Sequence, residues 1–390
     1  MLGGGEQHIR RLAALLSASG MPGTVVTRRG ESAWPSEETL EGVRVLRVPP
    51  PGPSRAGKYR MVPGAVAALL GRAEPFDVLV VRGTRVLGVP GLVAGRLAGK
   101  AVVLQPEVNG EMSGEAYWWG TSLDRPLPRA VLAPAVGLRN RLLADADAFV
   151  AMSRRIRDEL VAAGLPAAKI AWIPHGVDTS RFRPPAPGEA ERLRASLGLP
   201  PGGTILTYTG RLLRGKGLET ALEAFAKLAP GRPQLHLLLV GSGAGQSLSV
   251  EEGLRRAVAE SGLERRVTFA GRVENVDDFL RASDVFVFPS VFEALGLSLI
   301  EAAATGLPAV GARTGGIVDV IEDGASGFLF EPGDVGDLAA SLLALVDDPV
   351  LRRRLGERAR QVALERFDER ASVERYRTLF LEIANGKPRP

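Results

Sequence analysis

Short apolar runs alternate with amphipathic stretches throughout the second half of this 390-residue chain. Most of the runs are β-rich and end at Gly or Pro, which is typical of buried strands in a parallel sheet. The stretches between them carry apolar residues at i, i+3 and i+4 and predict helices. The series therefore predicts an α/β fold with a doubly wound sheet. The strand candidates are residues 204–210, 235–241, 267–271, 285–290, 308–313 and 327–331.

The first half repeats this alternation less regularly. A Pro-rich, charged stretch over residues 178–193 separates the halves and is the best linker candidate. We therefore expect two Rossmann-like domains that face each other across a cleft. The strand candidates of the first half are residues 23–28, 43–49, 76–83, 100–107 and 147–153.

The expected domains are residues 1–183 and 184–369, followed by a C-terminal helix over 370–390 that could cross back to the first domain. The first domain raises one difficulty. Only Met1 and Leu2 precede the glycines of "GGGEQH", whereas a Rossmann-like domain normally begins with an apolar strand. We expect either that the start of the chain has been assigned too late or that the first strand of this domain is missing.

Composition excludes several classes of function. The chain has 49 basic and 44 acidic residues, and this mild excess suits an anionic substrate or an acidic membrane surface without demanding nucleic acid. It has no cysteine, which excludes thiolate catalysis and cysteine-based metal sites. Its three histidines are His8, His175 and His236, too far apart in the sequence to predict a metal site.

No targeting or membrane-spanning segment is predicted. The start lacks the apolar core of a signal peptide, and the most apolar window, residues 76–99, contains Arg82, Arg85 and Arg96. We expect a cytoplasmic protein. Residues 125–143 mix Arg with apolar residues and could lie against the inner face of a membrane, although a helix lining a cleft would look similar.

A glycine-rich loop with basic residues follows the strand at 204–210. Gly210, Gly215 and Lys216 match the first seven positions of a phosphate-binding G-x-x-x-x-G-K loop, but Gly217 stands where an NTPase needs Ser or Thr to hold magnesium. Basic side chains at a helix N-terminus can still bind a diphosphate without metal. The alternative is a solvated basic loop.

Two further glycine groups are weak signals. Gly241, Gly243 and Gly245 approach G-x-G-x-x-G, but Gln246 stands where the last glycine would be expected. Gly315 and Gly316 begin a predicted helix, where bare backbone can approach a ligand. Tight turns use the same residues.

Glu293 and Glu301 lie eight positions apart in "PSVFEALGLSLIEAAATGLP". On one regular helix they would be about 12 Å apart along the axis. Paired glycosidase carboxylates lie about 5–9.5 Å apart, so the spacing argues against an acid/base pair. A loop carrying Glu293 and then a helix carrying Glu301 fits better. A helix-start residue and a solvated helix residue are the structural alternatives.

Seven segments in a fixed order make the chain resemble the retaining glycosyltransferases of family 4, which have the GT-B fold. The stretch from Glu293 to Glu301 is similar to the family's E-x7-E element. The resemblance implies transfer of a sugar from a nucleotide-diphosphate sugar to a glycan, lipid-linked or small-molecule acceptor with retained configuration. The segments are residues 3–8, 173–182, 210–217, 240–243, 269–273, 282–310 and 314–330.

The resemblance also assigns roles to single residues. It implies that Arg211 and Lys216 grip the diphosphate leaving group, that Glu293 lies beside the sugar, and that Glu301 accepts the ribose hydroxyls. It implies further that the remaining donor-binding residues wall the base or approach the sugar and phosphates. They are Gly4, Gly210, Gly243, Val273, Ala294, Leu295 and Gly296.

On the acceptor side the chain departs from the family. Many members carry a histidine where this sequence has Gln105, followed by Glu107 and Asn109. Gln cannot act as a base. His175 replaces the usual Asn of another loop and is interpreted as a loop variant.

The resemblance implies a hexosyltransferase that needs neither metal nor cofactor, uses a UDP or GDP sugar, and serves cell-envelope polysaccharide synthesis. Two alternatives stay open at this stage. One is a nucleotide-sugar epimerase, which would consume the donor without an acceptor. The other is a catalytically impaired nucleotide-sugar-binding protein, which Gln105 and the short start keep open.

Overall fold

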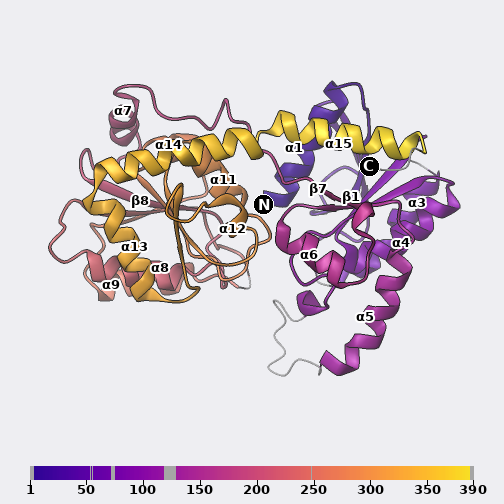
Figure 1. The fold of residues 1–390 in the computed structure, drawn as a ribbon, viewed down its shortest axis with the longest axis horizontal. Coiled ribbons are helices and arrows are strands. Elements are labelled where there is room, and N and C mark those ends of the chain that lie inside the picture. The colour runs from indigo at the N-terminus through magenta and orange to yellow at the C-terminus, as the bar shows by residue number, and fades with distance from the viewer. Residues whose placement is uncertain are drawn as a thin grey trace. The chain divides into compact units, whose positions relative to one another are not determined.

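The computed structural model describes residues 4–52, 54, 56–71, 75–117, 129–246 and 248–386, with backbone alone for 4–7, 117 and 129–131. The chain forms two compact units (Figure 1). The first unit combines Met1–Pro174 with Arg370–Pro390, and the second is His175–Glu369.

The second unit is built on one six-stranded parallel sheet. Its two central strands, β8 and β11, are buried along their whole length, as the uninterrupted apolar runs predict. The strand order is β10-β9-β8-β11-β12-β13. The strands are β8 (Thr204–Thr209), β9 (Leu235–Val240), β10 (Val267–Gly271), β11 (Val285–Phe288), β12 (Ala309–Ala312) and β13 (Gly327–Phe330).

Helices surround this sheet (Figure 1). Asp334 and Asp348 cap the two helices that follow β13, since each side chain accepts hydrogen bonds from two amides of the first turn. The helices are α7 (Glu189–Ser196), α8 (Leu218–Leu228), α9 (Glu251–Glu260), α10 (Val276–Arg281), α11 (Leu297–Ala304), α12 (Ile317–Val320), α13 (Val335–Asp347) and α14 (Pro349–Arg366).

The first unit contains two sheets. One is the parallel sheet β4-β5-β6-β7, and the other is β1-β3-β2, in which β2 runs antiparallel to β3. A doubly wound sheet has its first strand near the centre, and the described part of this unit has no strand that joins the two sheets. The strands are β1 (Thr24–Arg28), β2 (Glu37–Leu40), β3 (Val43–Val48), β4 (Val78–Arg82), β5 (Ala101–Gln105), β6 (Ala148–Ala151) and β7 (Ile170–Trp172).

Helix α15 (Glu369–Ala384) starts at the last residue of the second unit and then packs on the four-stranded sheet of the first. Tyr376 is fully buried there with Leu379, and its hydroxyl accepts a hydrogen bond from Gln105 Nε2 at 3.0 Å. The other helices of this unit are α1 (Gly4–Ala18), α2 (Gly57–Arg60), α3 (Val62–Gly71), α4 (Thr84–Leu97), α5 (Arg129–Leu143) and α6 (Arg154–Ala162), with 3-10 turns at Glu115–Tyr117 and Ala167–Lys169.

Across the described ranges of both units, no helix has the length and apolar character needed to cross a membrane.

Candidate active site

The loop between β8 and α8 depends on glycines for its backbone conformation and its close packing. Gly217 precedes α8 with φ 65°, and a Cβ on it would lie 1.9 Å from the carbonyl oxygen of Pro289. Gly210 follows β8 directly, with φ 148°. Ser or Thr at Gly217 would collide with the Pro289 backbone, so the close packing of two strand ends requires glycine here. This loop is therefore not a magnesium-binding NTPase loop.

Lys216 and Glu293 form an ion pair at the carboxyl ends of two neighbouring strands. Lys216 follows β8 and Glu293 follows β11, and these strands pair in parallel register. Lys216 Nζ lies 2.6 Å from Glu293 Oε2, with 23% and 17% of the two side chains exposed. Arg211 lies on the same loop as Lys216 with an exposed side chain. The loop ends thus bring a cation and a carboxylate together at the edge where α/β sheets bind ligands.

The loop after Glu293 packs closely on the turn at Gly316. A Cβ on Gly316 would lie 2.4 Å from the backbone oxygen of Ala294 and 2.5 Å from Leu295 Cα. The Gly316 amide donates to the backbone carbonyl oxygen of Glu293 at 3.2 Å. Close packing against the protein's own backbone therefore requires glycine at 316, as the alternative of a tight turn predicts.

Gly296 places the start of helix α11. It has φ 94°, and a Cβ there would lie 2.9 Å from the Phe288 ring. Within the described part of the chain, the amides of Ala294, Leu295 and Gly296 donate no hydrogen bond. Three N–H groups therefore remain available beside Glu293 at a helix N-terminus, which favours binding of negatively charged oxygens.

Glu301 lies on α11, within the second unit. It is partly buried, and this burial raises its pKa to about 7; Arg181 opposes the shift and Asp277 adds to it. Its carboxylate makes no hydrogen bond to any residue that the structure describes. Its oxygens can therefore accept hydrogen bonds from a ligand.

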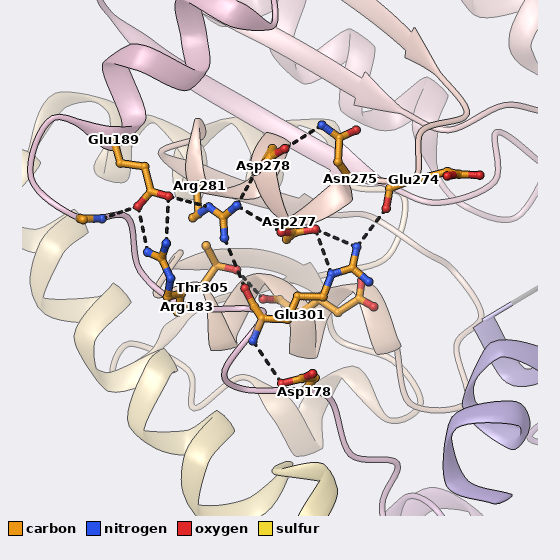
Figure 2. Close-up of polar contacts among 12 residues, drawn as sticks. Asp178, Arg183, Glu189, Glu274, Asn275, Asp277, Asp278, Arg281, Glu301 and Thr305 are labelled. Carbon is orange, nitrogen blue, oxygen red and sulfur yellow. Dashed lines mark hydrogen bonds and ion pairs between the residues drawn. The ribbon is translucent and has the colours of Figure 1, made fainter. Parts of the chain in front are cut away.

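An ion-pair network lies around Glu301 (Figure 2). Arg281 on α10 contacts Glu189 at 3.4 Å and Asp277 at 3.1 Å, and it also pairs with Asp278. Arg181 binds Asp277 at 2.7 Å. The network joins the start of the second unit to α10, and so it holds Arg181 and Asp277 close to the Glu301 carboxylate.

Arg183 extends this network. Its guanidinium makes two hydrogen bonds to Glu189, at 2.8 and 3.0 Å, and holds the pKa of that carboxyl at about 2. Sequence reasoning interpreted residues 178–193 as a linker and assigned none of these side chains to the site. Residues 178–193 and helix α10 both contain Arg as well as acidic residues, and only this feature of the sequence could have suggested that the two segments pair.

The acceptor-side candidates lie on one loop of the first unit, at the carboxyl end of β5. Gln105 and Asn109 are buried there. Glu107 is more exposed, and its Oε1 lies 3.4 Å from Arg82 Nε. The backbone of the same loop is held by Glu111 and Glu159, to which sequence reasoning gave no role.

Two family models match the chain. Glycosyl transferases group 1 matches residues 189–362, and the Glycosyl transferase 4-like domain matches residues 3–176. A D-inositol 3-phosphate glycosyltransferase of Catenulispora acidiphila is 30% identical over 92% of this chain and 85% of that protein. A D-inositol 3-phosphate glycosyltransferase of Streptomyces avermitilis is 32% identical over 92% of this chain and 78% of its own. The chain belongs to glycosyltransferase family 4.

Solved structures show the fold of this family 4 chain. Sucrose-phosphate synthase from Thermosynechococcus elongatus superposes with a TM-score of 0.82 at 24% identity, covering 99% of this chain and 94% of that one. Anabaena HepE in complex with UDP and glucose superposes with a TM-score of 0.76 at 22% identity, covering 97% and 96%. The predicted α/β fold with two Rossmann-like domains is confirmed, and the protein is a glycosyltransferase of the GT-B fold.

The remaining donor-side candidates of this glycosyltransferase are dispersed. Gly4 opens α1 in the first unit. Val273 follows β10 and packs on the core cluster around Phe279. The Gly243 amide donates to Glu251 at 2.9 Å, and a Cβ there would lie 2.4 Å from the Leu212 oxygen. Gly243 is thus required by packing and borders a hollow of about 760 Å³.

No group of three or more His, Asp or Glu side chains that could hold a metal ion occurs among the residues described for this glycosyltransferase.

Proposed function

We propose that this glycosyltransferase moves a hexosyl unit from a UDP sugar to an acceptor hydroxyl with retention of the anomeric configuration. Structures of Anabaena HepE, which shares the fold, contain UDP, UDP with glucose, or UDP-glucose. The observation that carries the proposal is the Lys216–Glu293 pair beside the available amides that precede α11. A cation and amides suit phosphate oxygens, and a carboxylate suits sugar hydroxyls.

In this proposal Lys216 and Arg211 stabilise the departing diphosphate. The bond between the sugar C1 and the β-phosphate oxygen breaks, the acceptor oxygen bonds to C1 on the same face, and the acceptor proton leaves with the diphosphate. Charge develops on the diphosphate oxygens, where a fixed cation acts most strongly. The Lys216 ammonium has three donors, so it can keep its contact with Glu293 and still bind phosphate oxygen.

We propose that the donor lies along the N-terminal part of α11, from the amides that precede the helix to Glu301. The amides of Ala294, Leu295 and Gly296 would bind the sugar or phosphate, Glu293 would lie beside the sugar, and Glu301 would accept the ribose hydroxyls. The absence of hydrogen bonds on Glu301 within the described residues supports this role. Beyond these, Gly210, Gly243 and Val273 would border the base and phosphates.

We also propose that the protein works in the cytoplasm on cell-envelope glycans and can contact the inner face of a membrane. Helix α5 supports this, since Leu138 and Leu142 are 60% and 48% exposed beside the exposed Arg141. Apolar and basic side chains together favour an anionic bilayer surface. Co-sedimentation with anionic vesicles, lost when both leucines are replaced by Ser, would support it; equal binding of the variant would contradict it.

A donor panel tests the main proposal. Thermal unfolding of the full chain is measured with UDP, GDP and ADP sugars, because a ligand that binds only the folded state raises its Tm. We expect the largest shift with a UDP sugar, and product NMR should show the anomer of the donor. A larger shift with GDP or ADP sugars would contradict the choice of nucleotide, and an inverted product would contradict retention. Sugar rearrangement without any acceptor would instead indicate an epimerase.

A further inference from the structure

The carboxylate of Glu159 accepts hydrogen bonds from backbone amides of the acceptor loop, which is residues 105–116. Glu159 Oε2 accepts the amide of Gly110 at 2.7 Å, and Glu159 Oε1 accepts the amides of Met112 and Ser113 at 2.7 and 2.8 Å. Such a turn with converging N–H groups is the type of backbone that commonly binds an anion. Here a protein carboxylate on α6 already occupies that position.

Glu111 fills a second position of the same kind. Its Oε2 accepts the Thr84 hydroxyl at 2.6 Å and the Arg85 amide at 3.2 Å, in the first turn of the 14-residue helix α4. Its Oε1 accepts the amides of Glu107 and Val108 at 3.0 and 3.3 Å. The helix N-terminus beside the acceptor loop therefore carries a negative charge supplied by the protein, where an anionic ligand would otherwise be favoured.

The basic side chains beside the loop are bound to protein oxygens as well. Arg139 Nη2 donates to the backbone carbonyl oxygens of Glu111 at 2.6 Å and Met112 at 3.3 Å. Arg85 Nη1 donates to the oxygen of Ala116. Arg82 lies 3.4 Å from Glu107. These cations stabilise the loop's own carbonyl and carboxylate oxygens.

The loop carries side-chain oxygens that can accept hydrogen bonds. Gln105 is fully buried at the end of β5; its Nε2 donates to Tyr376, while its Oε1 has no partner in the part of the chain that the structure describes. The Glu107 carboxylate is 42% exposed. The exposed Glu107 carboxylate can accept a hydrogen bond from a ligand hydroxyl. The dianion of a phosphate monoester has no hydrogen to donate to it.

Resting on the transferase function proposed above, we propose that the acceptor loop takes a neutral, hydroxyl-bearing acceptor and discriminates against a phosphorylated one. Glu111 and Glu159 are the specificity-determining positioning residues. They fill the anion-binding positions with fixed carboxylates, and they shape the backbone that presents Glu107. A phosphate placed on this loop would meet like charge and amides that are already bonded.

Inorganic phosphate tests the first half of this proposal without any acceptor. The ¹⁵N–¹H spectrum of the full chain is recorded during titration to about 10 mM phosphate, the range of a weak millimolar site. In the wild type we expect no saturable shift of the Gly110, Met112 and Ser113 amides. Glu159→Ala should let phosphate shift them, and Glu159→Gln, which keeps one carbonyl oxygen, should do so less.

Asp158→Ala is the matched control. Asp158 is the exposed neighbour of Glu159 on α6, so its loss changes the net charge equally without freeing the loop amides. The control should behave as the wild type. A saturable phosphate shift of the three loop amides in the wild type would overturn the proposal, and the spectrum of each variant reports directly whether it is folded.

Matched acceptor pairs test the second half. The pairs are myo-inositol with D-inositol 3-phosphate, and glycerol with glycerol 3-phosphate, each assayed with the donor that the panel identifies. We expect kcat/KM for the neutral member to be about 10-fold higher or more, since like-charge contacts disfavour the phosphate. Equal or faster use of the phosphorylated member would overturn the inference.

The transferase function and the acceptor preference can be contradicted separately. If no nucleotide sugar shifts the Tm, the proposed transferase function is contradicted. The phosphate titration of the loop amides does not depend on that result. Donor turnover with a preference for phosphorylated acceptors would overturn the acceptor inference alone.

Discussion

Lys216 Nζ lies 2.6 Å from Glu293 Oε2, although 77 positions separate the two residues in the chain. The contact exists because β8 and β11 are neighbours in the sheet and both carry their loops at the same edge. Opposite charges this close, each less than a quarter exposed, hold one another in place. The pair therefore presents a preorganised cation and an oriented carboxylate to a donor.

Replacing Lys216 tests its proposed action on the leaving group. We expect Lys216→Ala to lower kcat by about 10², because a fixed charge that stabilises developing negative charge contributes on that scale. Steady-state kinetics with a saturating donor measure it. Arg214→Ala, an exposed basic residue of the same loop, should change kcat less than twofold. Equal losses in the two variants would show a general charge effect and contradict a specific role for Lys216.

The raised pKa of Glu301 predicts how stability depends on pH. Burial favours the protonated carboxyl in the folded protein, so the stabilising contribution is complete below the ordinary pKa of 4.5 and is lost as pH rises through about 7. Glu301→Gln should therefore raise the free energy of unfolding at pH 8 by up to about 3 kcal/mol, and with it the Tm. At pH 4 it should have little effect on either. A similar change at both pH values would contradict a buried, ionising Glu301.

Nucleotide binding should release protons near pH 7. If ribose hydroxyls donate to Glu301, they favour its ionised form and lower its pKa, so UDP binding expels a proton from the fraction that is protonated. Calorimetry in two buffers of different ionisation enthalpy measures this directly. The release should disappear in Glu301→Gln. Identical enthalpies in both buffers for the wild type would argue against Glu301 as the ribose residue.

Local sequence patterns predicted the strands of the second unit well. Uninterrupted apolar runs identified the buried strands of the second unit, and the carboxyl ends of those strands carry Lys216 and Glu293, since ligand loops follow strand ends in α/β sheets. The strands β2 and β7 were not predicted. The first is the polar segment "EETL" with alternating exposure, and the second has three residues, so neither gives a clear apolar run.

Long-range pairs could not be predicted. Arg181 and Asp277 are 96 positions apart, and Glu159 and Gly110 are 49 apart. Nothing in the periodicity around Arg181 indicates α10 as its partner, because surface charges show no pattern that encodes contact at a distance. The same holds for Tyr376 and Gln105, which are 271 positions apart.

The Tyr376–Gln105 contact predicts a measurable stability difference. Tyr376→Phe removes the partner of the buried Gln105 amide, and a buried donor left without an acceptor costs about 1–3 kcal/mol. Urea unfolding should show this loss. Tyr59→Phe removes a hydroxyl from a side chain that is 52% exposed and should change stability by less than about 0.5 kcal/mol. Equal effects of the two substitutions would contradict a structural role for the contact.

Gly215 and Gly217 lie on one loop. Alanine substitutions at these two positions distinguish the cost of left-handed backbone strain from the cost of a steric collision. Gly215 and Gly217 both have positive φ, 86° and 65°, but a Cβ on Gly215 would meet nothing within 4 Å, whereas one on Gly217 would lie 1.9 Å from the Pro289 oxygen. Gly215→Ala should cost only the left-handed strain, about 1–2 kcal/mol. Gly217→Ala must also push the loop away from β11, which displaces Lys216. We therefore expect it to destabilise the protein clearly more in urea and to lower kcat/KM in parallel. Similar stability and activity of the two variants would contradict the requirement for close approach at Gly217.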